Sequence, residues 1–162
     1  MRSDSVKNMS AYADQNHAPS LTDVRLEYRK EDFIMLQDDY ILRQIREMVH
    51  AVMKMLFNVS ATELTPDVLE DQDVRDTLNG MLSLLEEGNI DQAENQLYDI
   101  TCDGDRQNLE IGLLFYYTLN GKSDEFLEAH NFSREEIMTG IQDLAERYNL
   151  SGIAEAFRTE IL

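Results

Sequence analysis

The chain has 162 residues, which is enough for one domain of ordinary size with a substantial core, and 43% of them are apolar. Its formal net charge at pH 7 is −18. A surface this acidic repels phosphate backbones, so the composition argues against nucleic-acid binding and favours a basic peptide or protein as partner. A second interpretation stays open, in which the charge only keeps the protein soluble in a crowded cytoplasm.

The negative charge is concentrated in the larger, C-terminal part of the chain. Residues 1–58 hold 9 acidic and 8 basic side chains, for a net charge of −1, whereas residues 59–162 hold 23 and 6, for a net charge of −17. Any electrostatic attraction of a basic partner is therefore expected from the second part.

Several absences point to a cytoplasmic protein. No apolar run approaches the ~20 residues that span a bilayer, so no membrane association is expected. The N-terminus has charges but lacks the apolar stretch of a secretory signal. Cys102 is the single cysteine and cannot form an intramolecular disulfide, which fits a reducing compartment.

The order of segments predicts an all-α protein, because the alternation typical of strands is nearly absent. Residues 1–20 are polar, without a periodic apolar stripe, and are interpreted as a flexible arm. Residues 21–162 are predicted to form a single all-helical domain. Within it, residues 21–35 are compatible with either a short helix or an extended segment.

Residues 36–58 form the most strongly periodic predicted helix. Its apolar residues recur at alternating spacings of three and four, which places them on one helical face. Two interpretations stay open for this face: it belongs to the core of the monomer, or it forms a structural homodimer. The candidate dimer face consists of Leu42, Ile45, Val49, Val52 and Leu56.

A helical hairpin is predicted next, from helices at about 72–87 and 90–100. Gly88 and Asn89 separate them, because Gly adopts the left-handed conformation that often ends helices. Ala93 is expected at the close contact between the two helices, since a small side chain lets two backbones approach.

The hairpin resembles a tetratricopeptide repeat. The resemblance rests on G-N-I-D-Q-A, residues 88–93, and a partial echo follows 33 residues later, close to the family period of about 34. The echo departs from the pattern at Phe126, which stands where the first copy has Ala93. The resemblance covers roughly residues 74–130 and implies helical hairpins stacked into a solenoid.

Two further hairpins are expected after the first. Residues 106–120 are predicted to be a strongly apolar helix, in which Gly112 implies a closely approaching neighbour. A short helix at 124–129 follows. Ser133 and Glu136 have the spacing of a capping box that opens a helix to Tyr148. The resulting fold prediction is a short, irregular solenoid of tetratricopeptide-like hairpins over residues 72–162, packed on the long amphipathic helix 36–58.

A second resemblance concerns the segment D-Y-I-L-R-Q-I, residues 39–45, followed by an apolar helix and an acidic helical part. Over about residues 36–130 the chain is similar to a family of bacterial proteins, mainly Gram-positive, whose function is unknown. This resemblance implies no activity.

A stacked solenoid implies a concave groove that accepts a peptide or a helix. The first helix of each hairpin is expected to line it. The sequence therefore predicts a non-enzymatic interaction or scaffold module that binds a protein or peptide in an acidic groove. The candidate groove residues are Leu84, Glu86, Glu87, Tyr116 and Tyr117.

No catalytic, cofactor-binding or metal-binding pattern is present, so an enzyme is not expected. The nearest approach is Glu47 with His50, whose spacing places both on one helical face, as in di-iron carboxylate bundles. Such sites need a second motif and further glutamates, which the sequence does not provide. A metal-dependent enzyme using carboxylates and His50 is the remaining alternative.

Overall fold

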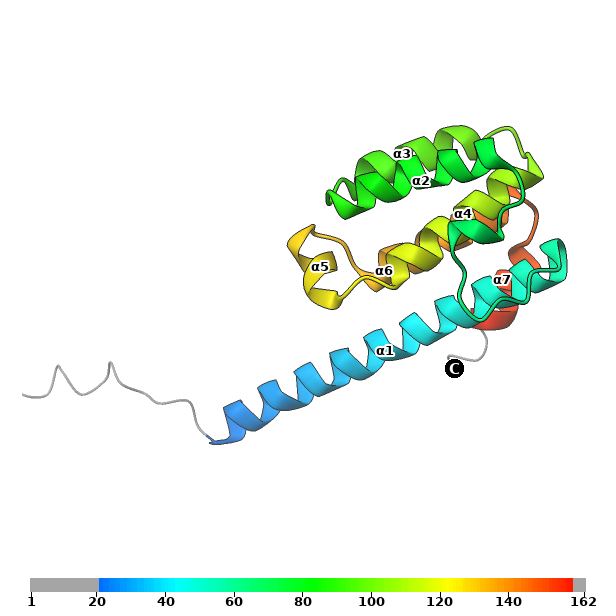
Figure 1. Cartoon of the computed structure of the whole chain (residues 1–162). Coiled ribbons are helices and arrows are strands. Elements are labelled where there is room, and N and C mark those ends of the chain that lie inside the picture. The colour runs from blue at the N-terminus through cyan, green and yellow to red at the C-terminus, as the bar shows by residue number, and fades with distance from the viewer. Residues whose placement is uncertain (1–20, 159–162) are drawn as a thin grey trace, which may run out of the picture. The chain divides into compact units, whose positions relative to one another are not determined.

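The computed structural model describes residues 21–158, which contain helices and no strand. This confirms the prediction of an all-α protein. Seven α-helices and one short 3-10 helix lie within this range. They are α1 (Leu21–Phe57), η1 (Pro66–Val68), α2 (Gln72–Glu86), α3 (Ile90–Thr101), α4 (Arg106–Asn120), α5 (Asp124–Ala129), α6 (Arg134–Arg147) and α7 (Ser151–Arg158). Figure 1 labels the α-helices.

The chain divides into two units, 1–37 and 38–162, and the boundary falls within α1. The first unit is described only over its part of α1, where the large apolar side chains of Phe33, Ile34, Met35 and Leu36 are exposed. The predicted arm at 1–20 lies outside the described residues. The second unit contains every other helix.

Helix α1 is longer than the predicted helix, because it begins at Leu21 and not at residue 36. The segment from residue 21 to 57 contains no Gly and no Pro, so no residue in it stops a helix. The C-terminal end was predicted within one residue. There Asn58 adopts a left-handed conformation, with φ of 57°, immediately after Phe57.

Helices α2 and α3 pack against each other as the predicted hairpin. Gly88 between them has φ of 80°, which confirms its predicted left-handed role. The Asn89 amide donates to the Leu84 carbonyl at 2.8 Å and closes the end of α2. Ala93 is fully buried, as expected for the close contact.

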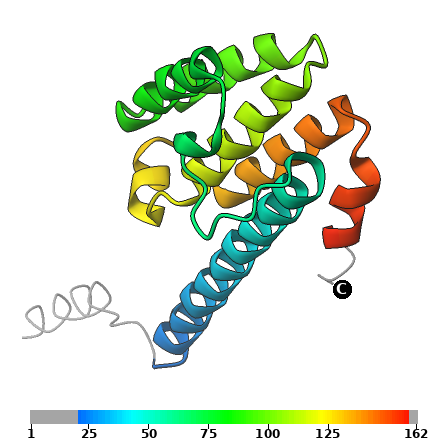
Figure 2. The same cartoon turned by 45° about the vertical axis from the view of Figure 1, so that its right-hand side comes forward.

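Helix α4 occupies the centre of the second unit and packs against α2, α3 and α6 (Figure 2). Its buried residues lie on all sides of the helix and not along one stripe, as expected for a central helix. Gly112 allows α6 to approach, because a Cβ there would lie 2.7 Å from the Leu144 side chain. The predicted close neighbour of Gly112 is therefore confirmed.

A buried arginine fixes the turns around α5. Arg134 opens α6 behind the predicted capping box of Ser133 and Glu136, which is present. Its guanidinium donates to the Asp124 carboxylate at 2.6 and 2.9 Å, to the Asn120 carbonyl at 2.8 Å and to the Lys122 carbonyl at 3.1 Å. One side chain thereby satisfies backbone carbonyls that follow α4 and joins them to α6.

The substitution Gly88→Ala should destabilise the fold by more than about 1 kcal/mol, because a Cβ costs energy at positive φ and would overlap the His130 ring. The matched control is Gly80→Ala inside α2, where apart from the adjacent residues and the local helix backbone no atom lies within 4 Å of the added Cβ. That change should stabilise the helix by roughly 0.5–1 kcal/mol. Urea denaturation followed by circular dichroism measures both, and equal effects of the two changes would contradict this account of the turn.

Arg134→Ala should destabilise the fold by about 2–4 kcal/mol, because it leaves two backbone carbonyls without their donor and removes a buried ionic partner. The control is Arg46→Ala, which removes an exposed salt bridge to Glu63 and should cost at most about 1 kcal/mol. The same denaturation experiment compares them. A loss for Arg134→Ala no larger than that for Arg46→Ala would disprove the role of Arg134.

Candidate functional site

The two tyrosines of the predicted groove lie on different faces of α4. Tyr116 is buried, and its hydroxyl donates to Glu94 on α3 at 3.0 Å. Tyr117 is half-buried, its ring meets His50 edge-on at 5.3 Å, and its hydroxyl donates to Glu63 at 3.2 Å. Consecutive helical residues diverge by about 100°, so one groove does not contain both.

The other predicted groove residues also contact other parts of the protein. Leu84 is half-buried against the core. Glu86 forms a salt bridge with Lys122, and Glu87 accepts a hydrogen bond from the Asn89 side chain at 3.2 Å. The structure does not bring the five predicted residues together, and among them only Tyr116 lines one of the larger cavities described below.

The predicted dimer face is largely internal. Ile45 and Val49 have no exposed surface and Val52 is 5% exposed, so all three belong to the core. Leu42 and Leu56 are half-buried at its edge. Of the two interpretations that the sequence left open, the burial of these side chains fits the one in which the face belongs to the core of the monomer.

His50 packs on Tyr117, whereas Glu47 on the same helix is exposed. Among the described residues, no group of three or more His, Cys, Asp or Glu side chains is placed to hold one metal ion.

An acidic, aromatic-lined groove lies where α3, α4 and α6 meet. We call it the tyrosine groove; its volume is about 380 Å³. It is formed by one helix of the first hairpin, by the central helix and by α6, and not by the first helix of each hairpin as predicted. Its lining residues are Asp91, Glu94, Asn95, Tyr98, Tyr116, Phe132, Glu136, Thr139, Gly140, Asp143 and Arg147.

Tyr116 forms the floor of the groove because Gly140 gives it room. A Cβ at Gly140 would overlap the Tyr116 hydroxyl and ring, so a larger residue on α6 would displace the tyrosine. Burial raises the pKa of the Tyr116 hydroxyl, and the neighbouring Glu94 carboxylate raises it further. The hydroxyl therefore stays protonated and donates its hydrogen bond to Glu94 at every physiological pH.

Glu94 is the most perturbed carboxyl of the groove. Burial raises its pKa above the ordinary value of 4.5, and the hydrogen bond from Tyr116 lowers it in part. The acidic groups of Asp91, Glu136 and Asp143 raise it again. The groove thus concentrates negative charge that its own residues do not neutralise locally.

A guanidinium already binds an aromatic ring at the edge of this groove. Arg147 lies over the Tyr98 ring, 4.8 Å from its centroid, and donates a hydrogen bond to Thr101. This contact shows that the groove edge accommodates a planar cation on a tyrosine face.

Sequence reasoning missed most of the groove. Asp91 and Glu94 are three residues apart on α3, and Glu136 and Asp143 are seven apart on α6, so each pair shares one helical face. That spacing was a usable signal, but in a chain with 32 acidic residues it is common. Only the packing of α3 beside α6 shows which pairs face each other.

Comparison with known proteins identifies the family. The sequence profile of DUF6483, a family of unknown function, matches residues 35–149. The chain belongs to this family. The match begins within α1 and ends just after α6, so it includes the tyrosine groove of this DUF6483 protein. No curated protein matches the sequence, and no solved structure matches either.

The DUF6483 assignment confirms one part of the second resemblance, which is that the chain belongs to a family of unknown function. The bacterial, mainly Gram-positive attribution and the tetratricopeptide resemblance stay predictions. Within the described range, no helix combines the length and the apolar character needed to cross a bilayer.

Glu94→Gln should leave the fold intact and raise its stability at pH 7 by at most about 1 kcal/mol, reduced by solvent screening because the carboxylate is only partly buried. The folded protein holds this proton more tightly than the unfolded chain, so ionised Glu94 opposes folding above its raised pKa. The gain should disappear below pH 4.5, where both states are protonated.

Denaturation of wild type and Glu94→Gln at several pH values measures this difference. The control is Glu47→Gln on the exposed face of α1, which should show no such pH-dependent gain. A loss of stability at neutral pH for Glu94→Gln would contradict the described environment of Glu94.

Proposed function

We propose that this DUF6483 protein is a non-enzymatic interaction module that binds a basic segment of a partner protein in the tyrosine groove. The observation that carries the proposal is the distribution of carboxylates along the groove: Asp91 and Glu94 on α3 face Glu136 and Asp143 on α6. Among the described residues that line the groove, Arg147 at the edge is the one cation.

The spacing of these carboxylates favours an extended ligand over a single ion. No three of them converge as metal ligands do, within the part of the chain that is described. Separate negative charges along a groove instead match basic side chains that project at intervals from a peptide or helix. The aromatic walls supply contact for the aliphatic parts of such side chains.

The aromatic residues also favour arginine in the partner. Tyr98 is 56% exposed at the groove edge, where the Arg147 guanidinium already lies over its ring. A guanidinium stacks on aromatic rings and forms paired hydrogen bonds with carboxylates, which a lysine ammonium does less well.

The hairpin arrangement supports the same function. Helices α2 and α3 form a hairpin, α4 packs on both, and α6 follows on α4, an order consistent with a short tetratricopeptide-like solenoid. Solenoids commonly use grooves between stacked helices for peptides. A cytoplasmic location and a scaffold role belong to this proposal, with the partner defined only by its basic character.

A labelled hexa-arginine peptide should bind the full chain, and fluorescence anisotropy should show the affinity falling as salt rises. The double substitution Asp91→Asn and Asp143→Asn should weaken binding by tenfold or more, roughly the loss of one or two charged contacts. Glu136 is left unchanged in this variant, because its side chain is part of the capping box of α6.

The matched control is the pair Asp67→Asn and Asp99→Asn, which removes the same charge from exposed positions outside the groove. It should change the affinity by less than about twofold, because distant charges are screened. Equal losses for the two double variants would reduce the binding to general charge attraction and disprove the groove. Absence of any peptide binding at low salt would disprove the proposed function itself.

A further inference from the structure

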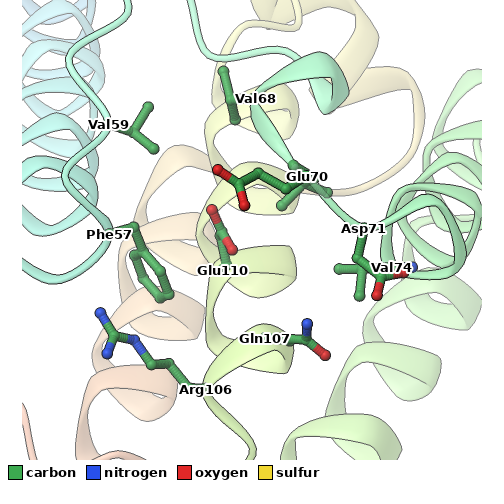
Figure 3. Close-up of a pocket in the computed structure, with 10 residues that line it drawn as sticks. Phe57, Val59, Val68, Glu70, Asp71, Val74, Arg106, Gln107 and Glu110 are labelled. Atoms are coloured by element: carbon green, nitrogen blue, oxygen red, sulfur yellow. Dashed lines mark hydrogen bonds between the residues drawn. The ribbon is translucent and has the colours of Figure 1, made fainter.

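A second and larger cavity lies on the other side of α4 from the tyrosine groove. Its volume is about 580 Å³, within the range of ligand pockets. The end of α1, the segment that contains η1, the start of α2 and the start of α4 enclose it (Figure 3). Half of its lining residues are apolar, namely Phe57, Val59, Val68, Leu69 and Val74, and the others are Glu70, Asp71, Arg106, Gln107 and Glu110.

Ionic groups of both signs line this cavity without pairing. The carboxylates of Glu70 and Glu110 point toward each other, and Arg106 lies one helical turn before Glu110 (Figure 3). Residues spaced in this way on a helix commonly form a salt bridge. Here the Arg106 guanidinium instead lies over the Phe57 ring, 5.0 Å from its centroid.

Neither carboxylate forms a salt bridge within the described part of the chain, and Arg106 forms none there either. Burial raises the pKa of Glu110, Arg106 lowers it, and Glu70 raises it again. The cavity therefore presents two carboxylates that form no salt bridge among the described residues and, beside them, a guanidinium that lies over an aromatic ring.

We infer that this cavity binds a small zwitterion, an α-amino acid with an apolar side chain. Its ammonium group would lie between Glu70 and Glu110, and its carboxylate would accept hydrogen bonds from Arg106. Its side chain would pack on the valines of the wall. This site is separate from the tyrosine groove and does not depend on the proposed function.

Arg106 and Glu110 share one face of α4, where Cβ atoms one turn apart lie about 5–6 Å from each other. A small zwitterion presents both of its charges to this face. A dipeptide carries its two charges at the ends of a longer backbone. A simple amine or a simple carboxylate satisfies only one end of the site.

Isothermal titration of the full chain with L-leucine tests the site. Leucine should bind at millimolar concentrations or below. L-leucinamide, which lacks the carboxylate, and 4-methylpentanoate, which lacks the ammonium, should each bind at least tenfold more weakly, since each loses a charged contact. Leucyl-leucine should also bind more weakly. Absence of leucine binding, or equal binding of any of these three compounds, overturns the inference.

Two substitutions locate the site. Arg106→Gln and Glu110→Gln should each weaken leucine binding about tenfold or more. Their controls are Arg43→Gln and Glu47→Gln, which make the same changes at exposed positions of α1 and should leave binding unchanged. Circular dichroism confirms folding of each variant. Unchanged leucine affinity in a folded Arg106→Gln or Glu110→Gln variant overturns the assignment.

The groove variant separates this inference from the proposed function. Asp91→Asn with Asp143→Asn should bind leucine as well as the wild type does, because neither residue lines this cavity. A parallel loss of leucine and peptide binding in that variant would place leucine in the tyrosine groove and overturn the inference.

Discussion

The second unit depends on one constraint, which is that α4 is buried on all of its sides. Its neighbours α2, α3 and α6 have to surround it, because leaving any face of this helix in water would expose large apolar side chains. The close approach of α6 at Gly112 completes this enclosure. Polar residues on different faces of α4 are then directed by the helix into different boundaries between neighbours.

The three polar features of the unit follow from that central helix. Tyr116 is directed between α3 and α6, Tyr117 toward His50 of α1, and Glu110 toward the loop that carries Glu70. A single helix thereby contributes to the tyrosine groove, to the contact with α1 and to the cavity lined by Glu70 and Glu110. The groove and the cavity both combine carboxylates with one arginine: Arg147 lies over Tyr98 at the groove edge, and Arg106 lies over Phe57 in the cavity.

The sequence predicted the helices well and the candidate site poorly. Local signals fixed α4, α5 and the capping box of α6, since cap residues and apolar spacing act within a few positions. The start of α1 was predicted 15 residues too late, because residues 21–35 are helix-compatible but lack a regular apolar stripe. The groove was assigned to residues near Gly88 and to both tyrosines, and only Tyr116 belongs to it.

By itself, the sequence determined the all-α class, the turn at Gly88 and the acidic character of the C-terminal part. Each of these depends on local backbone preference or on a simple sum of charges. Only the tertiary structure decided that Ile45, Val49 and Val52 are core residues, that Asp91 faces α6, and that Arg106 stacks on Phe57 without pairing with Glu110. Those facts depend on which helix faces meet, and an apolar or acidic stripe has the same appearance in sequence whichever neighbour it contacts.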